Sequence, residues 1–168
     1  MPISTAMTGH RDGVASASAE WLLRAFPPAG DVFAAARARW QAREATELAV
    51  LLRYPTAVDD ALLELCGPGG SGRLDETAGA DPSGGAGLAP WRTWVDEVVV
   101  SWAAALLGDP LLAAAAASAV GAPLDGPLVA PSPGDLAAGG LLRHPDLLGP
   151  VADLHRASLD LALAAPAA

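Results

Sequence analysis

Three side chains of the sequence have the chemistry to form a small metal or acid–base site: Glu44, Glu47 and His155. The two glutamates are three residues apart, so a helix places both on one face, beside its apolar stripe. Carboxylates that face a core can share a proton, bind a metal or accept from an arginine, because ionised groups are rarely buried unpaired. The alternative is a partly exposed helix on which Glu47 pairs with Arg43 one turn earlier.

His155 falls in a predicted last helix, on the face that carries apolar residues. A histidine there either donates to a backbone carbonyl in the core or serves as a metal ligand or proton carrier. The sequence contains no Glu-x-x-His pair of the di-iron kind, no His-Glu-x-x-His and no Gly-x-Ser-x-Gly. It therefore predicts a small helical metalloprotein or enzyme only if Glu44, Glu47 and His155 converge in the fold.

Composition excludes several other chemistries. All ten basic residues are arginines, so no lysine can form a Schiff base or hold a transferring phosphate. The run from Gly67 to Gly72 matches the Gly-x-Gly-x-x-Gly dinucleotide pattern, but it follows a predicted helix instead of a strand. Cys66 is the single cysteine, and its place at a predicted helix end disfavours a thiolate. We expect no cofactor, and the balance favours a protein without catalytic activity.

Charge and hydropathy restrict the partners and the location. The net charge is −9 and no arginine stripe is apparent, which disfavours nucleic acid, whose phosphates must be neutralised. Residues 1–12 lack the apolar core of a signal peptide, and a lone cysteine suits a reducing compartment. The apolar stretch 98–120 is interrupted by Gly108-Asp109-Pro110 and so predicts two helices instead of a membrane span. We expect a cytoplasmic protein that binds neither membrane nor nucleic acid.

The elements that position these residues are predicted to be helices separated by proline corners. Alanine and leucine dominate an apolar fraction of 52%, and β-branched residues rarely alternate with polar ones. The sequence therefore predicts an all-α fold, an irregular bundle of about six to seven helices. Their expected bounds are near 18–26, 32–54, 57–66, 90–107, 110–120, 135–143 and, with either of two starts, 146–165 or 150–165.

Two stretches without apolar periodicity interrupt the helices. Residues 67–89 are rich in Gly, Ser, Asp and Pro and are expected to form a flexible linker, and residues 121–134 a second one. The predicted organisation is a flexible N-terminus (1–17), an N-terminal helical lobe (18–66), the linker (67–89) and a C-terminal helical lobe (90–168). The two lobes are expected to form one integrated domain.

Three corners share a local form in which two leucines precede a proline, at 51–55, 106–110 and 141–145. Such corners occur in helical-repeat arrays, where stacked helix pairs present a binding face. A true array holds its period, whereas these corners are unequally spaced. The pattern leaves both a repeat and a coincidence open.

The clearest candidate for an interaction surface is a tryptophan stripe in the predicted fourth helix. Trp91, Trp94 and Trp102 recur at helical spacing, and Val100 projects opposite them. A helix apolar on two sides is either central to the core or part of an interface, where aromatic anchors commonly dominate the binding energy. The function expected first is a non-catalytic adaptor or scaffold that associates with a protein partner or with itself. The alternative, besides the metalloprotein, is an accessory subunit that binds a peptide or small molecule for a separate enzyme.

Overall fold

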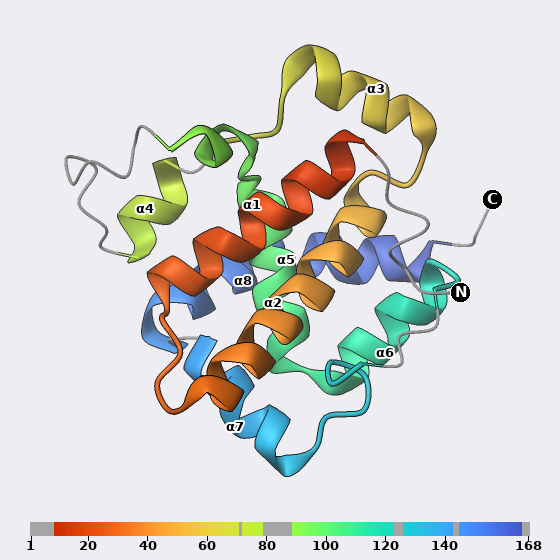
Figure 1. The fold of residues 1–168 in the computed structure, drawn as a ribbon. Coiled ribbons are helices and arrows are strands. Elements are labelled where there is room, and N and C mark those ends of the chain that lie inside the picture. Colours follow the sequence, from red (N-terminus) through yellow and green to blue (C-terminus); the bar gives the residue numbers. More distant parts are fainter. Residues whose placement is uncertain (1–8, 71, 79–88, 123–125, 143–144, 166–168) are drawn as a thin grey trace.

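The computed structural model describes residues 9–70, 72–78, 89–122, 126–142 and 145–165. Every regular element among these residues is a helix, which confirms the predicted all-α fold (Figure 1). In chain order the elements are α1 (His10–Ala25), α2 (Val32–Arg53), α3 (Ala57–Cys66), α4 (Gly72–Ala78), the 3-10 helix η3 (Pro90–Trp94), α5 (Glu97–Gly108), α6 (Pro110–Ala119), α7 (Pro133–Leu142) and α8 (Pro145–Ala164).

Several boundaries agree with the local signals in the sequence. Asp31, Thr56 and Asp109 each accept a backbone N–H at the start of a helix, as expected for capping residues. α5 ends at Gly108 and Pro110 begins α6, so the apolar stretch 98–120 forms two helices as predicted. In the described part of the chain, no helix combines the length and the hydropathy needed to cross a membrane. The third leucine-proline corner includes residues that the structure does not describe.

Helices α2 and α5 lie at the centre of the molecule (Figure 1). α1 and α7 pack on α2, and α8 packs against α5. Short side chains permit this close arrangement, because one face of α2 is built from alanine. The buried residues of that face are Ala38, Ala42, Ala45 and Ala49. Interaxial distances depend on the side chains at the contact, so an alanine face brings the neighbouring backbones close.

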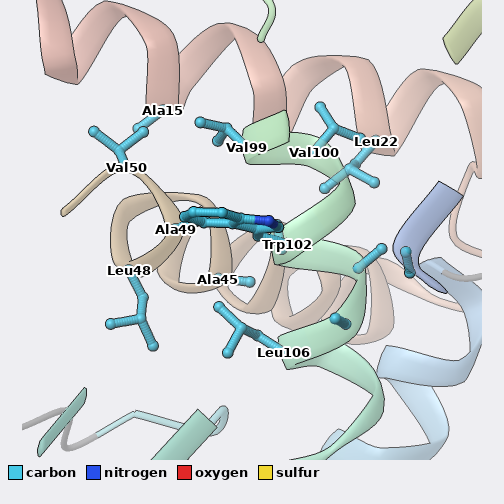
Figure 2. Packing of buried hydrophobic residues seen from close by; sticks show 14 of the residues in the cluster. Ala15, Leu22, Ala45, Leu48, Ala49, Val50, Val99, Val100, Trp102 and Leu106 are labelled. Carbon is cyan, nitrogen blue, oxygen red and sulfur yellow. The ribbon is translucent and has the colours of Figure 1, made fainter. Parts of the chain in front are cut away.

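The core joins helices from both sides of the predicted linker. A single cluster of buried apolar side chains contains residues of α1, α2, α5, α6 and α8. In Figure 2 the indole of Trp102 extends from α5 toward Ala45 and Ala49 of α2, and Leu22 of α1 lies beside Val100. The N-terminal and C-terminal helices therefore bury their apolar faces against each other.

The structure differs from the expected first helix. α1 begins at His10 instead of near residue 18, so much of the stretch predicted to be flexible is helical. Its apolar residues there are small: Val14, Ala15 and Ala17 are buried, and serines follow Ala15 and Ala17. No long apolar side chain marks the periodicity of this half of the helix, and packing against other elements stabilises it.

Part of the predicted linker is also structured. Residues 72–78 form α4, and its Leu74 and Asp75 are buried. The indole N–H of Trp21 donates to Asp75 at 2.9 Å, and Arg92 forms an ion pair with the same carboxylate. These partners are distant in sequence, so local propensity did not predict α4. The glycine run at 67–72 therefore precedes a helix, but it follows α3 instead of the strand that a dinucleotide site needs. Residues 71 and 79–88 of the predicted linker lie outside the described residues.

A buried aspartate divides the predicted fourth helix into η3 and α5. Asp96 is fully buried, and its Oδ1 accepts the backbone N–H groups of Val98 at 2.8 Å and Val99 at 3.2 Å. Asp96 therefore caps α5. The residue before it, Val95, has extended backbone angles, φ −71° and ψ 128°. The chain changes direction at this point, so Trp91 and Trp94 do not share a helix face with Trp102.

The same carboxylate connects α5 to α2. Its Oδ2 accepts from the Arg53 guanidinium at 3.2 Å and from the Tyr54 hydroxyl. The backbone N–H of Asp96 also donates to the Ser18 hydroxyl of α1 at 3.5 Å. Burial, together with the hydrogen bond to Asp96, raises the pKa of the Tyr54 phenol. The phenol therefore remains a donor to this carboxylate over the physiological pH range.

We predict that Asp96→Ala lowers the free energy of unfolding by about 2–4 kcal/mol, because it removes a helix cap and leaves the Arg53 and Tyr54 donors unpaired. Tyr54→Phe removes one hydrogen bond and should cost about 1 kcal/mol. Urea denaturation followed by circular dichroism measures both. An Asp96→Ala chain as stable as Tyr54→Phe would contradict the central role of this carboxylate.

Candidate functional site

The three residues predicted as metal ligands do not form a ligand set. Glu44 and Glu47 lie on α2, whereas His155 lies on α8. Across the described residues, no three or more His, Cys, Asp or Glu side chains are grouped so that they can hold a metal ion. The hypothesis of a metal site built on Glu44, Glu47 and His155 is therefore wrong for this fold, and each residue has its own hydrogen-bonding, ion-pair or charged surroundings.

Glu47 forms the ion pair that the alternative interpretation predicted. Its carboxylate pairs with Arg43 one turn earlier on α2. Arg43 also forms an ion pair with Asp12 and donates to the Ser16 hydroxyl, both on α1. Arg43 thus connects α2 to the first half of α1, and Glu47 stabilises it in that position.

Glu44 is buried and holds the segment after α6 against α2. The backbone N–H of Leu128 donates to Glu44 Oε2 at 3.0 Å. Gly126 approaches even more closely, since a Cβ atom there would lie 2.0 Å from Glu44 Oε1. Burial raises the pKa of Glu44, and the hydrogen bonds from Leu128 and Gly126 act in the opposite direction. The sequence placed this carboxylate on the apolar side of α2 correctly, but its partner is the backbone.

His155 is half-buried on α8. Burial lowers the pKa of its imidazole, and the charge of Arg73 acts in the same direction. The nearby carboxylates of Glu97 and Asp96 act against this shift. At neutral pH the imidazole is therefore uncharged.

The residues predicted for interaction divide into two groups. Val100 and Trp102 are only 0% and 6% exposed, because α5 is the central helix and other helices cover both of its apolar sides (Figure 2). The expectation that they contribute to an interaction surface is therefore wrong for this fold. Trp91 and Trp94 lie on η3 instead and are partly exposed.

Trp91 and Trp94 line a pocket of about 300 Å³ between η3 and α1. Its other lining residues come from one side of α1 and the residue before it: Gly9, His10, Gly13, Ser16, Ala17 and Glu20. The lining is mostly apolar, and the polar groups belong to few side chains. Small-molecule sites start at about this volume, and pockets of this kind also accept a side chain of a binding partner.

One wall of the pocket is a pair of stacked rings. The imidazole of His10 lies parallel to the indole of Trp94, with ring centroids 5.3 Å apart and planes 19° apart. Gly13 leaves space beside the same indole, since a Cβ atom at this position would lie 3.9 Å from it. Because glycine has no side chain, the Trp94 ring remains accessible from the pocket.

The charged side chains beside Trp91, the other tryptophan of the pocket, are paired within the chain. The Arg24 and Arg92 guanidiniums lie 5.2 Å and 5.7 Å from the Trp91 ring centroid. Arg24 pairs with Glu20 at 2.9 Å, and Arg92 pairs with Asp75. These cations already use the negative face of the indole. The pocket therefore suits an apolar group better than an additional cation.

The arrangement favours binding over catalysis. Ser16 is the hydroxyl of the pocket, but it accepts from Arg43 and has no histidine beside it among its described contacts. His10 stacks on an indole, where it can donate or accept a hydrogen bond at the rim. No family model, curated protein or solved structure matches this chain. The geometry of the pocket is therefore the main observation that bears on function.

The sequence carried a weak signal for the α1 side of this pocket. His10, Gly13, Ala17 and Glu20 recur at helical spacing, which places them on one face. Two of them are small and two are polar, so they form no apolar stripe. They line a pocket because Trp91 and Trp94, from a distant part of the chain, lie against them.

We predict that lowering the pH from neutral toward 4.5 raises the stability of the wild type relative to Glu44→Gln. Burial raises the pKa of Glu44 above the ordinary value of 4.5 that the unfolded chain retains, so the folded state binds this proton more tightly. The penalty for the buried charge disappears as the pH falls through the folded pKa. Urea denaturation of both proteins at several pH values measures this difference, and a difference independent of pH would contradict it.

We predict opposite effects for two glycine-to-alanine substitutions. Gly13→Ala should raise the free energy of unfolding by about 0.5–1 kcal/mol, because the helix gains propensity and the new methyl group contacts Trp94 at an ordinary 3.9 Å. Gly126→Ala should lower it, because the methyl group would lie 2.0 Å from Glu44 Oε1. Thermal unfolding measures both, and equal effects would contradict the two local geometries.

Proposed function

We propose that this protein is a non-catalytic helical adaptor, and that the pocket between α1 and η3 receives an apolar side chain of a protein partner. The observation that carries the proposal is the wall of two partly exposed tryptophans, Trp91 and Trp94, beside the space left by Gly13. Partly buried tryptophans in pockets are typical sites where binding energy concentrates. They offer a large apolar area at a low cost in conformational entropy.

The rim of the pocket supplies orientation. Glu20 and His10 carry polar atoms next to the apolar lining, and these can hydrogen-bond the backbone of a partner segment. A polar rim around an apolar centre is the general anatomy of protein interfaces. The internal pairing of Arg24 with Glu20 is solvent-exposed, so exchanging it for contacts with a partner costs little.

A second candidate function is an accessory subunit that binds a small apolar molecule for a separate enzyme. The volume of about 300 Å³ is sufficient for it, at the lower end of the range for small-molecule sites. Both candidates use the same pocket, so one variant that fills the pocket affects both. They differ in what is bound.

Photo-crosslinking in cells that naturally produce the protein tests the proposal. A photoreactive benzoyl-phenylalanine replaces Glu20 at the rim, and the expected result is a discrete adduct with one protein. Gly13→Leu in the same chain should abolish the adduct because the leucine occupies the space beside Trp94, whereas Gly13→Ala should retain it. The same photoreactive group at Ala157, which is exposed on α8, is the control for random encounters.

Each outcome separates the candidates. An adduct at Glu20 that persists with Gly13→Leu, or that forms equally from Ala157, contradicts binding through the pocket. If no protein adduct forms, native mass spectrometry of the purified wild type and of Gly13→Leu detects a bound small molecule. A molecule present in the wild type and lost in Gly13→Leu supports the second candidate in place of the first.

A further inference from the structure

A second apolar surface lies on the first half of α2, away from the tryptophan pocket. Phe33 and Trp40 are two helical turns apart on one face, and they are 80% and 59% exposed. They border a groove of about 470 Å³ between α2 and the segment 126–135. Exposed aromatic side chains of this size are unusual outside interaction sites.

The far wall of this groove is held in place by polar contacts. Arg37 of α2 pairs with Asp135 at 2.9 Å, and Gln41 donates to the backbone carbonyl of Asp135 at 2.6 Å. Glu44 holds Leu128 one turn further along α2. A groove with both walls fixed by such contacts is preformed, so a partner that enters it loses less free energy in ordering the site.

The charges that line this groove, Arg37 and Asp135, are paired with each other, and the exposed charge beside it on α2 is the positive Arg39. Residues 32–43 of α2 contain Arg37, Arg39 and Arg43 and no acidic residue, whereas the net charge of the chain is −9. Within the described part of the chain, Arg39 is exposed and forms no ion pair. The groove therefore suits an apolar surface that has an acidic residue on the side of Arg39.

Helix α3 carries a surface of that kind. Val58, Leu62 and Leu65 follow the helical spacing of one face and are 68%, 51% and 81% exposed. Leu63 is the one residue of α3 that is buried, so it points toward the body of the molecule and the apolar face points away from it. The acidic residues of α3 are Asp59, Asp60 and Glu64, and the helix has no basic residue. Glu64 forms no ion pair with any described residue.

We propose that the protein self-associates head to tail, with the apolar face of α3 from one copy docked in the α2 groove of the next. Within one copy the two surfaces cannot meet, because α3 and the start of α2 lie at opposite ends of the molecule (Figure 1). The interface is therefore heterologous: each copy offers its groove to one neighbour and its α3 to another. Such contacts build rings or open chains.

The positions of the free charges select the orientation of the two helices. Arg39 directly precedes Trp40, and Glu64 directly precedes Leu65, so each charge lies about 100° to the same side of its apolar face. Viewed along each helix from its N-terminus, both charges lie on the same side of the apolar face. When two such faces pack together, these two sides come next to each other only if the helices are antiparallel. With the two apolar faces fully overlapped and antiparallel, Arg39 of one copy and Glu64 of the other lie on the same side but about 8 Å apart along the axes, so a shift of about one helical turn brings them together.

The contact is small, since a helix of ten residues fills one groove. Interfaces below the standard size are weak, so the association depends on protein concentration. Sedimentation velocity at protein concentrations from about 1 µM to about 1 mM covers the range in which such weak complexes form. The expected result is a weight-average mass that increases steadily with concentration.

Complementary variants test the head-to-tail geometry. Trp40→Gln disables the groove and Leu65→Gln disables the α3 face, and each alone should weaken association about 30-fold or more. A mixture of the two should form a one-to-one dimer that grows no further, because one variant retains α3 and the other retains the groove. Leu161→Gln on α8, whose leucine is 74% exposed, is the matched control and should associate like the wild type.

Charge reversal tests the orientation. Arg39→Glu and Glu64→Arg should each weaken association about threefold to tenfold, because they place like charges together. The double variant should restore the affinity of the wild type. Circular dichroism of each variant verifies that the helices are intact.

Three results would overturn the proposal: a wild type that remains monomeric over the whole range, association that Trp40→Gln leaves unchanged, or a mixture that fails to form the one-to-one dimer. None of these variants alters the pocket between α1 and η3. Failure of the self-association and failure of the proposed partner binding are therefore separate outcomes.

Discussion

A carboxylate buried in a small helical protein is tolerated only where donors surround it, and Asp96 satisfies this condition with four of them. Two are the backbone N–H groups that open α5, and two come from Arg53 and Tyr54 at the end of α2. Losing water around such a charge costs several kcal/mol, which these hydrogen bonds must offset. The requirement determines where α5 begins and how it meets α2. It also turns the chain so that η3, with Trp91 and Trp94, lies against α1.

The peripheral helices α3 and α4 combine similar polar contacts with one core leucine each. Asp60 of α3 accepts the backbone N–H of Arg11 at 2.9 Å and so caps α1 from a different helix. Gly9 permits that approach, since its φ is +78° and a Cβ there would lie 2.7 Å from the carboxylate. Asp75 joins α4 to α1 by accepting the indole N–H of Trp21. On α3 these contacts and Leu63 face the body of the molecule, and the opposite apolar face with Val58, Leu62 and Leu65 remains exposed.

The two proposed binding surfaces, the pocket between α1 and η3 and the α2 groove, follow from where small and large side chains lie. Small residues of α1 leave a pocket under the tryptophans of η3, whereas large apolar residues of α2 and α3 project into solvent. A partner bound in the pocket and a second copy bound at the α2 groove would occupy different elements. An adaptor that uses both could present several copies of a partner along one assembly.

Local chemistry in the sequence determined the helical class, the capping residues Asp31, Thr56 and Asp109, and the pairing of Glu47 with Arg43, because each depends on neighbours within a few residues. Tertiary structure decided the rest. The sequence around Asp96 does not indicate that this residue is buried, and its partner Arg53 is 43 residues away. Contacts between residues distant in sequence also explain why α4 forms, why α1 begins at His10 and why Trp102 is buried. Whether an apolar face meets a neighbour or solvent depends on contacts between distant segments, which periodicity along one helix does not contain.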